Sequence, residues 1–212
     1  MMEPKIVFEK LQGRFGDVAF GYTEGGGVKD PFCKVKTEKL VEAALFLRDD
    51  PELRFDFLQC ATAVDLLKQG LFEVVYHLYS YQHHHSFVVK VDCPRQNPVV
   101  PSVVSVWPTA DWLEREQFDL LGVQFSGHPS LRRLLLPDDW EGHPMRKDYQ
   151  LPPGYRGMPT TRPSTLDLLV AFDKANPQAK AVALPAAASA PSPSAAGEAS
   201  PGGKPQNEKG VA

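Results

Sequence analysis

The chain has 212 residues, 42% of them apolar, and a formal net charge of −3, which fits one domain with an appendage and a core of ordinary size. The sequence pI of about 6.1 argues against nucleic acid as the main partner, because a nucleic-acid-binding face usually makes the balance basic. No apolar run resembles a signal peptide or a membrane span, so we expect a cytosolic protein that meets a membrane only through a partner.

The first residues fit a helix, a strand, a turn and a second strand. Glu9–Phe15 is compatible with a short helix and Asp17–Tyr22 with a strand. Gly25-Gly26-Gly27 reads as a flexible turn, because no phosphate-binding pattern follows it. Pro31–Val35 is compatible with a returning strand.

A helix is predicted over Thr37–Arg48. Thr37 can cap it, and the Asp49-Asp50-Pro51 run ends it. The apolar residues that share one face at helical spacing are Leu40, Val41, Ala44 and Leu45.

The middle of the chain predicts strands, because it is rich in β-branched and aromatic residues. Phe55–Val64, Phe72–Tyr81 and Ser86–Asp92 are the candidates, and the last two form a hairpin. Val99–Trp107 fits either a fourth strand or an extended connection, given the prolines in and around it.

A second helix is predicted over Thr109–Leu121, with Thr109 as its cap and Gly122 as its C-terminal stop. Beyond residue 125, repeated prolines predict irregular structure. Ser164–Asp167 resembles a capping box that opens a short helix ending near Lys174.

Together these elements predict an α+β fold: a small mixed or antiparallel sheet with helices packed on it, followed by an extended irregular C-terminal segment. We expect an α+β domain over residues 1–150 and an extended segment with a short helix over 151–180. Residues 181–212 are rich in Ala, Pro and Ser and are expected to be disordered unless partners bind them.

Trp112–Tyr149 is the most unusual segment, with 12 charged residues of both signs among 38. Trp, Phe, Tyr, His-Pro and Gly stand between the charges. An unpaired buried charge is costly, and the apolar content is too high for a solvated tail. Such a segment typically buries paired charges, often against something outside the chain.

Metal sites find little support in the residue spacing. His83-His84-His85 fits the polar tip of a hairpin better than a metal site, because neighbouring residues on a strand point to opposite faces. A metal-dependent hydrolase is the alternative: its ligands would be His128, His143 and the carboxylates of Glu114 and Glu116. The two glutamates are two residues apart, so they point to different sides of the predicted helix.

The three cysteines stand far apart, at Cys33, Cys60 and Cys93. Zinc and iron–sulfur sites normally need clustered thiolates, so neither is expected within this chain alone. Isolated cysteines suit a reducing compartment.

Two stretches of the charged segment carry a specific resemblance. Glu114–Arg133 (E-R-E-x-F-D-L-L-G-V-x-F-x-G-H-P-x-L-R-R) and Asp138–Tyr149 (D-D-W-E-G-H-P-x-R-K-D-Y) resemble the signature of the 30 kDa (C) subunit of respiratory complex I, the proton-translocating NADH:quinone oxidoreductase. The likeness extends from about Leu40 to Leu151. Leu121 and Met145 depart from it, standing where an aromatic residue and a leucine are typical.

The resemblance implies a structural subunit of the peripheral arm, without catalytic residues, that packs against the large (D) subunit near the quinone site. It implies no cofactor in this chain; flavin, iron–sulfur clusters and quinone would belong to partner subunits. It places the chain at the cytoplasmic face of the inner (plasma) membrane. The same module also resembles parts of membrane-bound hydrogenases and ferredoxin-driven complexes, an alternative that the sequence leaves open.

On this interpretation, Arg133→Ala or Glu116→Ala is expected to reduce complex assembly more than turnover per assembled complex. The side chains expected at the partner interface or in structural ion pairs are Trp112, Glu114, Arg115, Glu116, Asp119, His128, Arg132, Arg133, Trp140, His143, Arg146, Lys147 and Tyr149.

Overall fold

The computed structural model describes residues 3–25, 28–160 and 164–175. The chain divides into two units, Met1–Pro153 and Gly154–Ala212, and each is described by itself. The expected tail over residues 181–212 lies outside the described residues.

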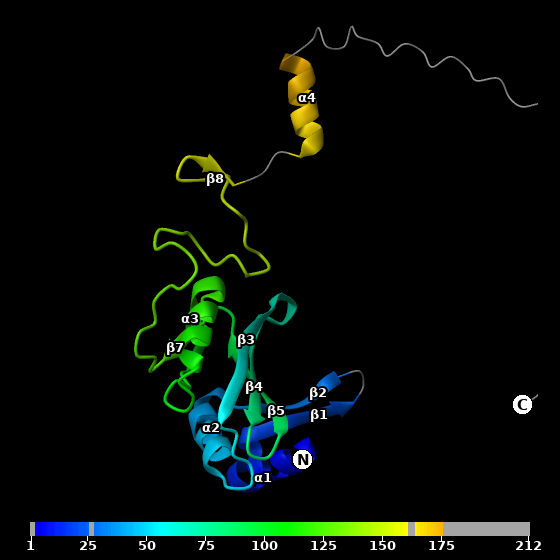
Figure 1. Cartoon of the computed structure of the whole chain (residues 1–212), viewed down its shortest axis with the longest axis vertical. Helices are drawn as coiled ribbons and strands as arrows, with labels where there is room; N and C mark the ends of the chain where they lie inside the picture. Colours follow the sequence, from blue (N-terminus) through cyan, green and yellow to red (C-terminus); the bar gives the residue numbers. More distant parts are fainter. Residues whose placement is uncertain (1–2, 26–27, 161–163, 176–212) are drawn as a thin grey trace, which may run out of the picture. The chain divides into compact units, whose positions relative to one another are not determined.

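A five-stranded sheet forms the centre of the first unit, in the order β1-β2-β5-β4-β3 (Figure 1). Strands β2 and β5 run parallel, and the other neighbours are antiparallel. The predicted α+β fold with a mixed sheet is therefore confirmed. The strands are β1 (Ala19–Gly25), β2 (Val28–Val35), β3 (Phe57–Leu66), β4 (Leu71–Ser80) and β5 (His85–Pro94).

Alternation along the strands decides which face is buried. In β4, Phe72, Val74 and Tyr76 point into the core, whereas Glu73 and His77 lie on the other face and are half-buried. That second face carries a charge network across three strands. Lys34 Nζ lies 2.7 Å from Asp92 and 3.2 Å from Glu73, and Lys90 Nζ lies 2.7 Å from Glu73.

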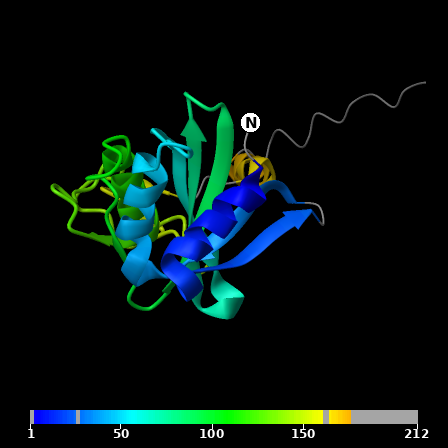
Figure 2. The ribbon, with the colours of Figure 1, turned by 90° about the horizontal axis from the view of Figure 1, so that it is seen from below.

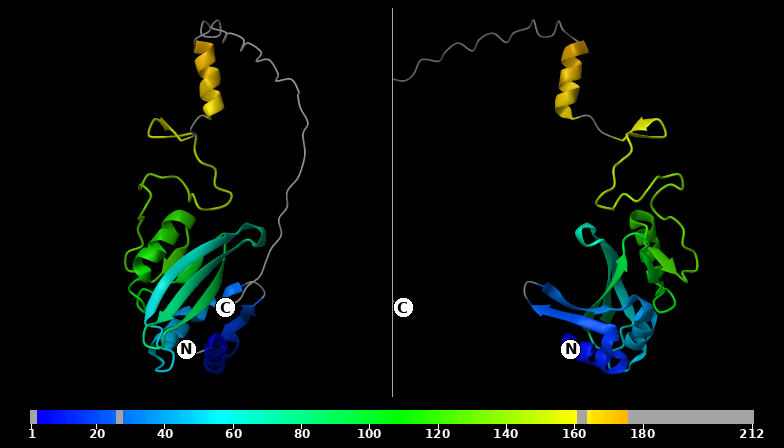
Figure 3. Two further views of the ribbon diagram at one scale, coloured as in Figure 1. Left: turned by 45° about the vertical axis from the view of Figure 1, so that its right-hand side comes forward. Right: turned by 180° about the vertical axis from the view of Figure 1, so that it is seen from behind.

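Three helices cover the apolar face of the sheet and share one core with it. They are α1 (Pro4–Phe15), α2 (Leu40–Asp49) and α3 (Ala110–Leu121). Figure 2 shows α1 and α2 against this face, and in Figure 3 none of the described helices of the first unit covers the opposite face. Helix α1 begins five residues before the predicted start, with Pro4 in its first turn, where a missing N–H costs nothing.

Thr37 does not cap α2 as predicted, and Thr109 stands at the predicted N-cap position of α3 but makes no capping bond with its side chain. Thr37 lies in a short 3-10 helix, Thr37–Lys39, and its hydroxyl donates to the Asp92 carbonyl at 3.0 Å. Helix α2 therefore begins at Leu40. Thr109 precedes α3 without a side-chain capping bond. The first threonine ties the helix entry to strand β5, a role that local spacing does not reveal.

Val99–Trp107 contributes only a short strand. Strand β6 (Val99–Pro101) pairs in parallel with β7 (Gln124–Ser126), apart from the main sheet. A fourth strand of the main sheet is excluded here, and residues 102–107 are not an extended connection either: residues 104–106 form a turn, in which the Val106 and Trp107 N–H groups donate to the Val103 carbonyl at 2.9 Å. Pro98, Pro101 and Pro108 cannot donate to a ladder, which limits the strand.

The histidine run forms the tip of the β4–β5 hairpin, as expected. Residues 81–84 make the turn, with His84 at φ 51°, and His85 opens β5. His85 is buried, and its Nε2 lies 2.9 Å from the Leu53 carbonyl. His83 Nε2 lies 3.0 Å from the Pro51 carbonyl. These contacts tie the tip to the loop after α2.

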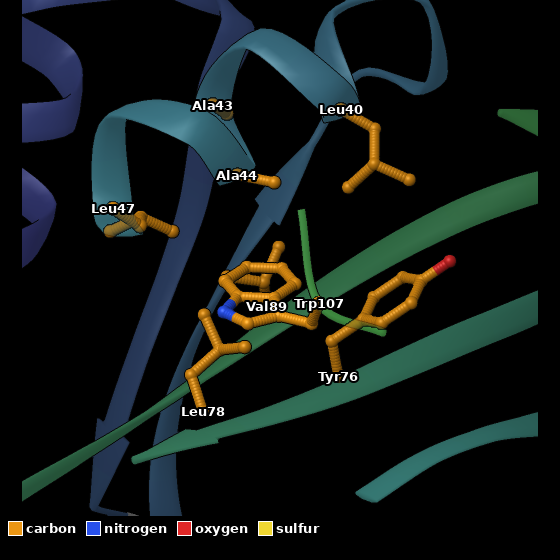
Figure 4. Close-up of a pocket in the computed structure, with 8 residues that line it drawn as sticks. All are labelled: Leu40, Ala43, Ala44, Leu47, Tyr76, Leu78, Val89 and Trp107. Carbon is orange, nitrogen blue, oxygen red and sulfur yellow. The ribbon is translucent and has the colours of Figure 1, made fainter. Parts of the chain in front are cut away.

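A small cavity remains between α2 and the sheet (Figure 4). It leaves about 10 Å³, the space of about one water molecule, so it is too small for a ligand. Trp107 fills most of the gap, and its Nε1 donates to the Phe55 carbonyl at 2.9 Å. The lining residues are Leu40, Ala43, Ala44, Leu47, Tyr76, Leu78, Val89 and Trp107.

Two aromatic residues of this cavity should respond differently to truncation. The Tyr76 hydroxyl is buried without a hydrogen-bond partner in the described part of the chain, so Tyr76→Phe should leave the free energy of unfolding unchanged or raise it by up to about 1 kcal/mol. Trp107→Phe loses a buried hydrogen bond and core volume, so it should cost at least about 2 kcal/mol. Urea unfolding of both variants checks the contrast.

The second unit holds a small hairpin and a helix. The hairpin pairs β8 (Gly154–Tyr155) with β9 (Met158–Pro159). Helix α4 (Thr165–Ala175) begins one residue after Ser164 and includes Lys174, which confirms the short helix that the sequence predicts.

Candidate docking interface

Helix α3 opens the charged segment and separates its side chains into two sets. Glu114, Arg115 and Asp119 are buried, whereas Trp112 and Glu116 are exposed. The expectation that the two glutamates point to different sides is confirmed. Each buried charge needs a partner, and these partners explain how the following irregular segment folds.

Asp119 anchors the loop that follows β7. Its Oδ2 accepts hydrogen bonds from the backbone N–H groups of Leu134, Leu135 and Leu136 at 3.1, 2.8 and 2.8 Å. Arg133 Nη1 adds a charge contact at 3.5 Å. Burial opposes ionisation of the carboxyl, but these bonds and the nearby cation outweigh it and hold the pKa of Asp119 below its usual value.

Arg115 holds the same loop from the previous turn of α3. Its Nε donates to the Arg132 carbonyl at 3.3 Å and its Nη2 to the Arg133 carbonyl at 3.4 Å. The guanidinium also lies 5.5 Å from the centre of the Trp112 ring. Arg115 therefore pairs with backbone carbonyls of the loop and orients an exposed indole.

The C-terminal end of α3 is capped by a later part of the segment. His143 Nδ1 lies 2.8 Å from the Asp119 carbonyl, and Arg146 Nε donates to the Leu121 carbonyl at 2.7 Å. The Met145 N–H donates to the Leu120 carbonyl at 3.1 Å. These bonds satisfy carbonyls that a helix leaves open, and the cation complements the helix dipole.

Gly122 makes this capping possible. It ends α3 at φ 76°, as the sequence predicts, and a Cβ there would lie 2.5 Å from His143 Nε2 and 2.7 Å from Arg146 Nη2. The positive φ alone should make Gly122→Ala destabilise the fold by about 1–2 kcal/mol. The close contacts of the added Cβ should increase this loss. Gly127→Ala is the control, since Gly127 has φ 82° but nothing near its Cβ position. Thermal unfolding should show a larger loss for Gly122→Ala.

Asp65, at the end of β3, anchors the last part of the segment. It accepts hydrogen bonds from Arg95 Nε and from the Lys147 N–H, both at 2.9 Å. Arg95 also forms an ion pair with Asp148. Burial works against the charged form of Asp65, but Arg95 and the Lys147 N–H more than compensate and lower its pKa.

Glu114 has a different environment, without an ion pair in the described part of the chain. Its Oε2 accepts from the Ser102 hydroxyl at 2.6 Å and its Oε1 from the Val103 N–H at 2.8 Å. Burial raises the pKa of Glu114 above its usual value, because these two bonds offset only part of the desolvation. Glu114 therefore fixes the connection after β6 to α3.

Asp119 and Glu114 should give opposite pH dependence of stability. The depressed pKa of Asp119 stabilises the fold above its ordinary pKa of 3.8, and this contribution is lost as pH falls through the folded value. The raised pKa of Glu114 stabilises the fold fully below 4.5, and this contribution is lost as pH rises through the folded value. Relative to Asp119→Asn the wild type should lose stability toward acid, and relative to Glu114→Gln it should gain stability. Urea unfolding across that pH range measures both.

The residues of the metal alternative are not brought together. His128 Nε2 lies 3.1 Å from Asp111, His143 binds the α3 carbonyl, Glu114 binds Ser102, and Glu116 is exposed. Among the described residues, no three or more potential ligands are grouped for an ion.

The other predicted residues also have intrachain roles or exposed positions. The Tyr149 hydroxyl donates to the Glu141 carbonyl at 3.2 Å, Trp140 is half-buried, and the Lys147 side chain is exposed. Sequence reasoning missed Asp65, Arg95 and Ser102. Asp65 stood within a stretch of family likeness, but nothing in its spacing indicates a partner 82 residues away.

An exposed surface remains around α3 once these anchors are accounted for; we name it the α3 face. Trp112, Leu135 and Met145 are 64%, 60% and 61% exposed. Leu135 and Met145 are carried by backbone bonded to Asp119 and Leu120. We define the α3 face as five exposed residues on α3 or on backbone bonded to it: Trp112, Glu116, Arg132, Leu135 and Met145.

Residues 33–155 match the family described as the respiratory-chain NADH dehydrogenase, 30 Kd subunit. The chain belongs to this family. The match includes β3–β5, α2, α3 and the whole irregular segment, so the intrachain anchors of the 30 Kd fold all lie within it.

Members of the 30 Kd family are among the similar proteins. The NADH-quinone oxidoreductase C subunit of Roseiflexus castenholzii is 47% identical over 141 residues, covering 66% of this chain and 80% of the relative. The corresponding protein of Chloroherpeton thalassium is 39% identical over 139 residues, covering 65% and 57%. A chain of the membrane-bound sulfane sulfur reductase, an archaeal respiratory membrane complex, is 27% identical with a TM-score of 0.57, covering 69% of this chain and 85% of that chain. None of the helices in the described residues is long and apolar enough to cross a membrane.

Proposed function

We propose that the chain is a structural subunit of the peripheral arm of a proton-translocating NADH:quinone oxidoreductase. In this proposal it docks against the large (D) subunit near the quinone site, at the cytoplasmic face of the inner membrane. It supports assembly and electron transfer from NADH to quinone, and it contributes no catalytic residue. Membership of the 30 Kd family supports the assignment to this complex. The α3 face supports the docking role.

The observation that carries the docking role is the exposure of Trp112 on α3 and of Leu135 and Met145 on backbone that is bonded to the Asp119 carboxylate and to the Leu120 carbonyl. Large aromatic and apolar side chains on a rigid support are typical anchors of protein interfaces. Arg115 restrains the Trp112 ring in the free chain, which reduces the entropy lost on binding. Glu116 and Arg132 add exposed charges to the α3 face.

We also propose that flavin, iron–sulfur clusters and quinone are held by partner subunits. Thiolates, rather than thiols, bind clusters. Burial raises the pKa of Cys33 to about 12 and that of Cys93 to about 11, so both thiols stay protonated. The three cysteines also lie on three different strands: Cys33 on β2, Cys60 on β3 and Cys93 on β5.

Purification of the tagged chain from its own cells tests the proposal. We expect the large subunit of the quinone site and other arm subunits among the co-purifying proteins identified by mass spectrometry. Subunits of a hydrogenase or a ferredoxin-driven complex would instead favour the second candidate, which the likeness to an archaeal respiratory membrane complex supports. A lone monomer that turns over a small molecule unaided would contradict both.

A further inference from the structure

Helix α4 of the second unit presents apolar side chains to solvent. It has 11 residues, and five large apolar side chains on it are between 48% and 70% exposed. They are Leu166, Leu168, Leu169, Val170 and Phe172. The described residues of this unit leave most of their surface uncovered.

These positions form one broad apolar side of the helix. Successive residues are rotated by about 100°, so positions 166, 168, 169, 170 and 172 share an arc of about 200°, and positions 167, 171, 174 and 175 occupy the opposite side. A broad apolar side of this kind is normally covered by other protein or by a membrane. The length and the charge of α4 distinguish these two surroundings.

A membrane is the poorer fit. Eleven residues of helix reach about 16 Å, roughly half of the 30 Å hydrocarbon layer. Helices that lie in the membrane interface are typically rich in Lys and Arg, which attract anionic lipids. Residues 165–175 contain one lysine, Lys174, and two aspartates, Asp167 and Asp173, so an anionic lipid surface would repel this segment.

We propose that α4 is a second docking element, which inserts into an apolar groove with a neutral or basic rim on a neighbouring protein subunit. This is the helix-in-groove mode of recognition, in which several side chains of one helix act as anchors. The α3 face belongs to the other unit of the chain, so α4 shares no residue with it. The inference rests on the proposed function only in placing the chain within a multi-subunit complex.

A competition experiment with the full-length chain tests this inference. Tagged variant and differently tagged wild type are produced together in the native cells, and their ratio is measured in the purified complex. Leu166→Glu with Leu169→Glu should lower the incorporated ratio by about 100-fold, since buried anchors dominate affinity. Lys174→Glu is the matched control, because it changes the net charge of the same helix by the same amount; its ratio should stay near one.

Several results would overturn the inference. These are a ratio near one for the double variant, or an equal loss for Lys174→Glu. Self-association of the wild type through α4 would also contradict it, as would α4-dependent binding of the wild type to vesicles of phosphatidylcholine and phosphatidylglycerol. Melting of the first unit, measured on the purified variants, should be unchanged. Trp112→Ala in the same competition separates the proposals: normal incorporation of Trp112→Ala with loss for the double variant would reject only the α3 face.

Discussion

Asp119→Ala is expected to lower the free energy of unfolding by about 3–5 kcal/mol, the range typical for removing one member of a buried charged contact. The carboxyl is fully buried and accepts three consecutive backbone N–H groups of the 134–136 loop. Alanine would leave those donors and the Arg133 cation without their acceptor. Each unsatisfied buried donor adds its own desolvation cost, so the loop should detach from α3.

Asp138→Ala is the control for this prediction, because Asp138 is an exposed aspartate of the same segment. It should change the free energy of unfolding by less than about 0.5 kcal/mol. Asp119→Asn keeps one oxygen acceptor but loses the charge, so it should fall between the two. Urea unfolding measures all three. Equal stability of Asp119→Ala and Asp138→Ala would show that the loop does not depend on this carboxylate.

Trp112→Ala should have the second large effect, on association instead of folding. Anchors of interfaces cost at least about 2 kcal/mol when truncated, which is roughly 30-fold in affinity. When the variant and the wild type are produced together, the ratio of variant to wild type in the purified complex should therefore fall by at least about 30-fold. Because the indole is 64% exposed in the free chain, the free energy of unfolding should change by less than about 0.5 kcal/mol.

Tyr81→Ala is the matched control for Trp112→Ala. Tyr81 is a similarly exposed aromatic residue, 57% accessible, at the hairpin tip. We expect Tyr81→Ala to compete normally with the wild type. Turnover per assembled complex should be unchanged in both variants. Normal assembly of Trp112→Ala with abolished electron transfer would refute the docking role and indicate a direct part in the reaction.

The strands of the sheet could be predicted from the sequence because their evidence is local. Phe72–Tyr81 and Ser86–Asp92 carry β-branched and aromatic residues at alternating positions, and the observed strands differ by one or two residues. The end of α3 at Gly122 could be predicted for the same reason, because a glycine after a helix is a local signal. The prediction that Thr37 caps α2 failed because a tertiary contact takes its hydroxyl: it bonds to the carbonyl of Asp92, 55 residues away.

The roles of the charged residues were only partly predictable. The density of charges indicated buried pairs, but spacing cannot reveal that Asp119 would bind backbone N–H groups or that Arg115 would bind carbonyls. The partners Asp65 and Lys147 are separated by 82 residues. Contacts of this range depend on the complete topology, so no local pattern encodes them.

The anchoring of residues 131–149 has a consequence for the order of events in biogenesis. This stretch has no helix or strand of its own and is positioned by α3 and by Asp65 of β3. These long-range contacts can form only after helix α3 and strand β3 have folded. If the α3 face is the docking surface, as proposed, a polypeptide in which this stretch has not yet folded is not competent for recruitment into the complex.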